Sequence, residues 1–208
     1  VGQINVAAAT TFVAAEVGAA RWSAWINLGI AGYSEEPPGQ IFQINKIVQR
    51  STGKCLFPGY RFPKLISSRP LITLDTASAN YQDGVLFDME GFAFAEIGSR
   101  MSCNELTFLF KVVSDTPASC IANVDNNFVR ELIKQNIKTL KLISREILEL
   151  VAVERQRLAL PPEVVKVLQS FRFSATSEQQ LISKYRIWKA KNVENDFSEF
   201  CRGLKSAK

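Results

Sequence analysis

Apolar positions along the first half of the chain follow two different periodicities. The Ala-rich segment 5–21 has few helix-breaking residues and predicts a helix. The short apolar run 24–29 closes on glycine and predicts a buried strand followed by a turn. Apolar and polar residues alternate over 40–49, which indicates a half-buried strand, and 71–74 is a further short strand. The Gly- and Pro-rich segments 51–70 and 75–84 are expected to be loops.

The second half begins with a helical pattern. Apolar residues recur on one helix face over 89–101. The run 106–113 is apolar apart from Lys111, which is typical of a central parallel strand buried on both faces. Spacing near 3.6 residues then predicts a long helix over 126–157.

Strands and helices alternate up to residue 115, and this order predicts an α/β protein. We expect a three-layer α/β/α sandwich with a central mixed, largely parallel sheet. The pair Pro161-Pro162 marks a boundary between a domain over 1–160 and a helical C-terminal extension over 161–208. The extension is expected to hold helices at 162–170 and 177–204.

Composition excludes several classes of function. The 208 residues are 47% hydrophobic and 22% charged, which is ordinary for a soluble globular domain. No apolar run approaches the ~20 residues of a membrane helix, and no secretion leader is recognisable, so we expect a cytoplasmic protein. The absence of histidine removes Ser-His-Asp and Cys-His catalysis. Four scattered cysteines, with no close pair, are interpreted as free thiols and predict no metal site: Cys55, Cys103, Cys120 and Cys201.

The net charge of +5 is concentrated in the C-terminal part. Residues 1–120 carry 9 Lys/Arg against 10 Asp/Glu, whereas residues 121–208 carry 16 against 10. Basic residues interleaved with aromatic ones in the extension resemble a nucleic-acid surface. Periodic aromatic residues more often pack in a core, and we therefore expect packing and no nucleic-acid partner.

Two acidic segments stand at the ends of consecutive predicted elements. Phe87-Asp88-Met89-Glu90-Gly91 opens a helix, and Ser114-Asp115 closes the apolar strand. Such ends converge on the ligand crevice of an α/β protein, where two carboxylates can divide the work of glycosidic chemistry. Each segment alone also has a structural interpretation, because acidic residues offset a helix dipole and Ser-Asp can cap or turn.

Taken in order, four segments carry a family resemblance: Gly2–Ala8, Asn27–Gly32, Asp88-Met89-Glu90 and Val113-Ser114-Asp115. This order resembles the nucleoside phosphorylase and nucleosidase superfamily, which includes methylthioadenosine/S-adenosylhomocysteine nucleosidases, futalosine hydrolases and purine nucleoside phosphorylases. The resemblance covers residues 1–150 and implies hydrolysis of the N-glycosidic bond of a purine-type nucleoside. It also implies a homo-oligomer, with a dimer favoured, that needs no cofactor.

The resemblance assigns roles to individual residues. Glu90 would accept hydrogen bonds from the ribose hydroxyls, and Met89 would pack on the sugar. Asp115 would protonate the departing base as general acid, and Ser114 would position Asp115 or the base. Further contacts to the substrate are expected from Phe87, Asp88, Gly29, Ile30, Ala31, Gly32 and Lys111.

Three departures from the family pattern keep alternatives open. Ile30 replaces a small polar residue that faces phosphate or water, and Lys111 stands where an arginine is frequent. The family's first strand, with the acidic residue that activates water, has no counterpart in this sequence. A phosphorylase with inorganic phosphate as co-substrate therefore remains an alternative, as does a non-catalytic nucleoside-binding or scaffold protein with a basic helical tail.

Overall fold

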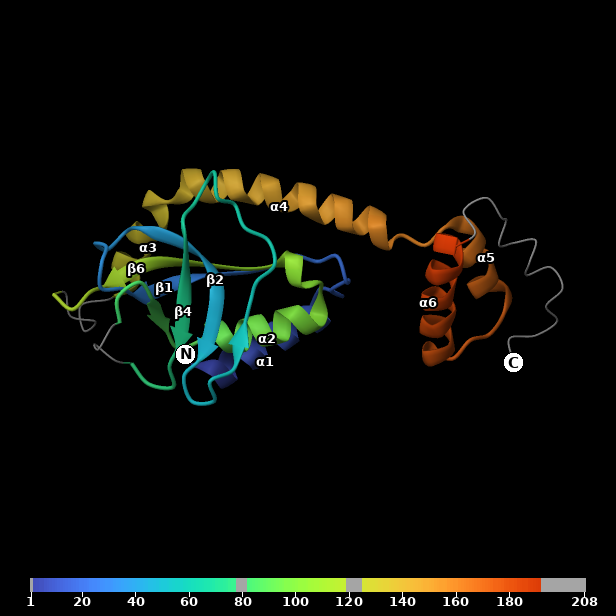
Figure 1. The fold of residues 1–208 in the computed structure, drawn as a ribbon, viewed down its shortest axis with the longest axis horizontal. Coiled ribbons are helices and arrows are strands. Elements are labelled where there is room, and N and C mark those ends of the chain that lie inside the picture. Colours follow the sequence, from blue (N-terminus) through green and yellow to red (C-terminus); the bar gives the residue numbers. More distant parts are fainter. Residues whose placement is uncertain (1, 78–81, 119–124, 192–208) are drawn as a thin grey trace. The chain divides into compact units, whose positions relative to one another are not determined.

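The computed structural model describes residues 2–77, 82–118 and 125–191, and the chain divides into two compact units, 1–156 and 157–208 (Figure 1). The strands are β1 (Trp25–Gly32), β2 (Ile41–Gln49), β3 (Cys55–Leu56), β4 (Ser68–Thr73), β5 (Leu86–Asp88) and β6 (Thr107–Asp115). The helices are α1 (Gln3–Glu16), α2 (Gly91–Met101), the short 3₁₀ helix η1 (Asn104–Leu106), α3 (Asn126–Gln135), α4 (Ile137–Leu158), α5 (Pro162–Ser170) and α6 (Ala175–Lys191).

The described strands form one mixed sheet in the order β3-β2-β4-β5-β1-β6. Parallel pairing joins β1 to β6, β2 to β4 and β4 to β5, which account for most of the paired residues. The α/β class and a mixed sheet are thus confirmed. The predicted three-layer α/β/α sandwich is not confirmed, because β2 also pairs antiparallel with β6 and thereby closes the sheet from β2 to β6 on itself.

Strand β2 closes the sheet because it is long and bent. Its first residues pair with β6, and the stretch from Gln43 to Gln49 pairs with β4. The register shifts between Ile44 and Lys46, opposite Pro70 of β4. A bulge bends a strand and tolerates a proline in its neighbour, since the extra residue interrupts the ladder. The same bulge explains why β4 begins inside the segment that was predicted as a loop.

Helices cover the sheet on two sides, with α4 along one and α1 and α2 along the opposite one (Figure 1). All nine residues of β6 are buried. Phe108 and Phe110 pack in the same core as Leu132 of α3 and Ile143 of α4, whereas Leu109 packs in the core that contains α2. Burial of both faces explains the continuous apolar run that identified this strand in the sequence.

Two predicted elements differ from the observed ones. Met89 does not begin a helix, because Leu86–Asp88 form the short strand β5 and α2 begins at Gly91. The helix predicted over 126–157 is interrupted at Asn136, whose side-chain amide donates to the carbonyl oxygens of Gly39 and Leu132, each at 2.9 Å. A side chain that bonds the backbone in this way competes with a continuous helix.

The second unit contains α5 and α6, which share a small apolar core. Tyr185 is buried there, and the partly buried Phe171, Phe173 and Trp188 pack against the same core, so these aromatic side chains are packing residues. Tyr185 Oη donates to Glu163 Oε1 at 3.0 Å, and burial raises the pKa of the Tyr185 phenol. The predicted helix beyond residue 191 lies outside the described residues.

Two of the four cysteines lie within the described residues. Cys55 and Cys103 are free thiols, and burial raises the pKa of Cys103. Cys120 and Cys201 lie outside the described residues. Within the described ranges, no helix combines the length and the apolar character that crossing a membrane requires.

Gly91 at the start of α2 gives a test of this packing. A Cβ atom there would lie 2.6 Å from Leu71 Cδ2 and 2.9 Å from Asp88 Oδ2. We expect Gly91→Ala to lower the free energy of unfolding by about 1–3 kcal/mol through overpacking, measured by urea unfolding. Gly98→Ala in the same helix is the control, because its closest contact would be 3.2 Å, to Thr107 Cγ2. A larger loss for Gly98→Ala than for Gly91→Ala would contradict the packing around Gly91.

Candidate functional site

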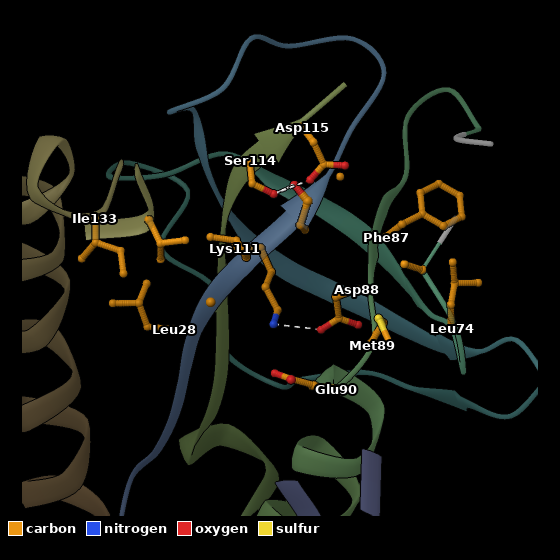
Figure 2. A pocket seen from close by; sticks show the side chains of 16 residues that line it. Leu28, Leu74, Phe87, Asp88, Met89, Glu90, Lys111, Ser114, Asp115 and Ile133 are labelled. Carbon is orange, nitrogen blue, oxygen red and sulfur yellow. Dashed lines mark hydrogen bonds and ion pairs between the residues drawn. The ribbon is translucent and has the colours of Figure 1, made fainter. Parts of the chain in front are cut away.

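The first unit contains a cavity of about 310 Å³, drawn from close by in Figure 2. Its walls come from β1, the connection between β5 and α2, the end of β6, and α3. Every residue that the sequence analysis selected lines this cavity: Phe87, Asp88, Met89, Glu90, Gly29, Ile30, Ala31, Gly32, Lys111, Ser114 and Asp115. The fold therefore brings three separate stretches of the chain to one place, while the chemical roles of these residues stay predictions.

The cavity lies where two strands of the sheet diverge. β1 meets β5 at a single residue pair, Gly32 and Phe87. From Trp25 to Ala31, β1 pairs with β6 on one side only. Its other side, which faces β5, pairs with no strand in the described part of the chain. The stretch from Leu28 to Ala31 is thereby available to line the cavity instead of continuing the sheet.

Gly29–Gly32 were expected to form a turn, but the structure shows that this prediction was wrong. They are the last four residues of β1 and pair in parallel with Lys111 to Asp115 of β6. The pairing of β1 with β6 reaches Gly32 because β6 continues as far as Asp115. Ile30 consequently lines the cavity from an extended strand.

A β-bulge at the end of β6 directs two neighbouring polar side chains into the cavity. Ala31 pairs with Val113, but the next residue, Gly32, pairs with Asp115, so Ser114 is skipped. Consecutive side chains of a regular strand point to opposite faces, and a bulge re-aims them. Both Ser114 and Asp115 line the cavity, both are 3% exposed, and their side chains are hydrogen-bonded to each other (Figure 2).

The backbone of Asp115 is held by a buried tyrosine. The Tyr33 N–H donates to the Asp115 carbonyl oxygen at 3.0 Å. The Tyr33 hydroxyl donates to Glu35 Oε2 at 2.7 Å and accepts from Arg69 Nε at 2.9 Å. Burial raises the pKa of the Tyr33 phenol above its ordinary value, although the hydrogen bond from Arg69 acts in the other direction. Arg69 also lies over the Phe42 ring, 5.1 Å from its centroid.

A buried ion pair crosses the cavity floor. Lys111 Nζ of β6 lies 2.8 Å from Asp88 Oδ2 of β5, and the two side chains are only 2% and 4% exposed (Figure 2). Gly29 of β1 makes room for this contact, because a Cβ atom there would lie 2.9 Å from the lysine nitrogen. The charge of Lys111 is therefore already paired with Asp88.

Asp88 is also the residue that caps α2. Its Oδ2 accepts the Gly91 N–H at 2.8 Å, and its Oδ1 accepts the Thr73 hydroxyl at 2.7 Å. Glu90 is the N-cap residue by position, yet its side chain makes no capping hydrogen bond. Instead, Glu90 Oε1 accepts the N–H of Gly2, at the start of α1, at 3.4 Å. The dipole interpretation of the acidic cluster thus fits Asp88, whereas the Glu90 carboxylate lines the cavity.

Sequence reasoning missed part of the cavity wall. The five missed residues are all apolar: Leu28, Leu74, Ala77, Val129 and Ile133. Val129 and Ile133 stand four residues apart on α3, so the sequence predicts that they share a helix face. It does not predict that this face lines the cavity. Thr73, which holds Asp88, has no signal in the local sequence at all.

No protein-family model matches the sequence, and no curated protein matches it. Among solved structures, the 5′-methylthioadenosine/S-adenosyl homocysteine nucleosidase of Campylobacter jejuni aligns with a TM-score of 0.53 at 15% identity, over 67% of this chain and 76% of that chain. The 5′-methylthioadenosine nucleosidase of Arabidopsis thaliana, in its apo form, aligns with a TM-score of 0.50 at 17% identity, over 73% and 70%. This chain therefore shares its fold with these two nucleosidases.

A solved structure from a third organism aligns at a lower TM-score. A 5′-methylthioadenosine/S-adenosyl homocysteine nucleosidase (MTAN) of Chlamydia trachomatis is 21% identical to this chain. It aligns with a TM-score of 0.47, over 59% of this chain and 64% of that one. The chain thus spans less than two thirds of the Chlamydia protein. Other structures of that protein are bound to MTA or to adenine.

The ion pair on the cavity floor can be tested through stability. We expect Lys111→Met to cost about 3–5 kcal/mol of unfolding free energy, because it leaves the Asp88 carboxylate buried and unpaired. The double variant Lys111→Met/Asp88→Asn removes that orphaned charge and should be more stable than Lys111→Met alone. Urea unfolding of the parent, both single variants and the double variant gives the coupling energy. Strictly additive losses would show that the two groups do not interact in solution.

Proposed function

We propose that this chain hydrolyses the N-glycosidic bond of a purine-type nucleoside. The observation that carries the proposal is that Asp115 and Glu90 line one cavity from different elements, each supported by its own network. The superfamily fold and the nucleosidases that share it make glycosidic chemistry the first function to test. In this reaction the departing base gains a proton while the ribose becomes positively charged, so an acid and a carboxylate serve opposite ends of one bond.

Asp115 is the proposed general acid. Ser114 Oγ lies within hydrogen-bond distance of both Asp115 Oδ1 and the Ala31 carbonyl oxygen, the latter at 3.3 Å. A hydroxyl has one proton and cannot donate to both acceptors at once. Ser114 therefore donates either to the Ala31 carbonyl oxygen or to Asp115 Oδ1, and in the second case it orients the Asp115 carboxyl group. A carboxyl group held in this way at the cavity wall is placed where a general acid could reach a departing base.

Glu90 is the proposed ribose ligand. Its carboxylate is not consumed by helix capping, because Asp88 performs that task. An ionised carboxylate accepts hydrogen bonds from sugar hydroxyls and stabilises the positive charge that develops on the ribose. Met89, immediately before Glu90, lines the same wall and offers an apolar surface for the sugar ring.

Hydrolysis is favoured over phosphorolysis by the charges of the cavity. Three carboxylates line it, and its one lysine is already paired with Asp88. A phosphate dianion would meet this negative surface and the apolar side chain of Ile30. The extended conformation of Gly29–Gly32 also differs from the nest of amides that binds anions.

Phosphorolysis remains the second candidate, and non-catalytic nucleoside binding the third. We further propose a homo-oligomer that acts in the cytoplasm without a cofactor.

The role of Asp115 predicts a specific kinetic effect. Asp115→Asn should lower the rate of base release from a purine nucleoside by a factor of about 10² or more, because the amide cannot protonate the leaving base. Nucleoside binding, measured by calorimetry, should change little. Asp83→Asn, at an exposed position outside the cavity, is the control and should keep the parent rate. Turnover above a tenth of the parent value in Asp115→Asn would remove the general acid role.

The nature of the nucleophile predicts which sugar is formed. Base release should proceed in phosphate-free buffer and yield free ribose, identified by mass spectrometry and a reducing-sugar assay. Inorganic phosphate facing Ile30 would lack a hydrogen-bond donor, at a cost of about 1–3 kcal/mol. Ribose 1-phosphate that forms in stoichiometric amounts, and only when phosphate is present, would identify a phosphorylase. Binding without release under either condition would identify the non-catalytic alternative.

A further inference from the structure

Thr73, the last residue of β4, occupies a central place in the network behind the cavity. It is 1% exposed, so its hydroxyl has no access to water. The hydroxyl donates to Asp88 Oδ1 at 2.7 Å and accepts the N–H of Phe92 at 3.0 Å. Thr73 itself does not line the cavity.

Together, Thr73 and Asp88 hold the first turn of α2. The first amides of a helix have no partner within the helix and need acceptors from elsewhere. Here Gly91 N–H is bound by Asp88 and Phe92 N–H by Thr73. Both acceptors come from strands β5 and β4, which pair in parallel at Thr73 and Asp88. The helix is therefore fixed to the sheet at the residue that follows Glu90.

We propose that Thr73 is a positioning residue that sets the direction of the Glu90 carboxylate. It acts through Asp88 and through the Phe92 amide, and it touches no substrate. Without the hydroxyl, Asp88 Oδ1 loses its donor and the first turn of α2 loses one of its two acceptors. Glu90, directly before that turn, then loses its fixed orientation toward the ribose. This inference rests on the proposed ribose-binding role of Glu90.

The test is Thr73→Val, which keeps the shape of the side chain and removes only the hydroxyl. Base release is measured with a purine ribonucleoside and with its 2′-deoxy analogue. For Thr73→Val we expect kcat/KM on the ribonucleoside to fall at least tenfold, and the preference for ribose over deoxyribose to shrink at least threefold. Thr73→Ser restores the hydroxyl and should stay within threefold of the parent in both quantities.

Thr107→Val is a matched control for burial and for contact with α2. Thr107 is 2% exposed, and its hydroxyl has no hydrogen-bond partner in the described structure. Its Oγ1 would lie 3.6 Å from a Cβ atom at Gly98, on the same helix but away from the first turn. Thr107→Val should leave both kcat/KM and the ribose preference at the parent level.

A second measurement does not depend on turnover. The carboxyl carbon of Glu90 is observed by ¹³C nuclear magnetic resonance and assigned by its loss in Glu90→Gln. Thr73→Val should shift this signal, whereas Thr73→Ser and Thr107→Val should not. If the parent releases no base from any purine nucleoside, the proposed function fails, and the Glu90 signal still decides the role of Thr73. An unshifted signal in Thr73→Val, or an unchanged ribose preference in an active enzyme, would overturn the inference.

Discussion

The buried ion pair between Lys111 and Asp88 is the interaction on which the cavity depends. It joins β6 to β5 across the place where β1 and β5 separate after one residue pair. Two charges taken out of water are favourable only when hydrogen bonds satisfy the groups that remain. Asp88 meets this requirement with the Thr73 hydroxyl and the Gly91 amide. The absence of a side chain at Gly29 completes the arrangement, since a Cβ atom would press on the ammonium group.

This pair also separates the tasks of two neighbouring acidic residues. Asp88 is fully occupied as cap, ion-pair partner and acceptor from Thr73, so it holds the structure together. Glu90, two residues later, is spared the capping role and faces the cavity. A single substitution at Asp88 would therefore disturb the ion pair and the first turn of α2 together, whereas one at Glu90 would change the cavity wall. Acidic clusters at helix starts can combine both functions, and only the hydrogen bonds distinguish them.

The sequence predicted those elements whose burial is regular. Strand β6 was identified because both of its faces are covered, and its Ser114-Asp115 end lines the same cavity as Glu90, as the sequence analysis expected. Strand β5 has three residues, too few for any periodicity to show. Closure of the sheet depends on a bulge in β2, and the break at Asn136 depends on a contact with Gly39, distant in sequence. Thr73 could not be predicted from the sequence for the same reason, because its hydroxyl bonds Asp88 and Phe92, which are distant in sequence.

The charge distribution of the cavity bears on the class of ligand it can transform. Its lysine is neutralised by Asp88, so the remaining carboxylates dominate the field felt by a ligand. Such a field favours a group that becomes more positive during reaction, as a ribosyl group does when its base departs. A ligand that brings its own dianion faces the opposite preference.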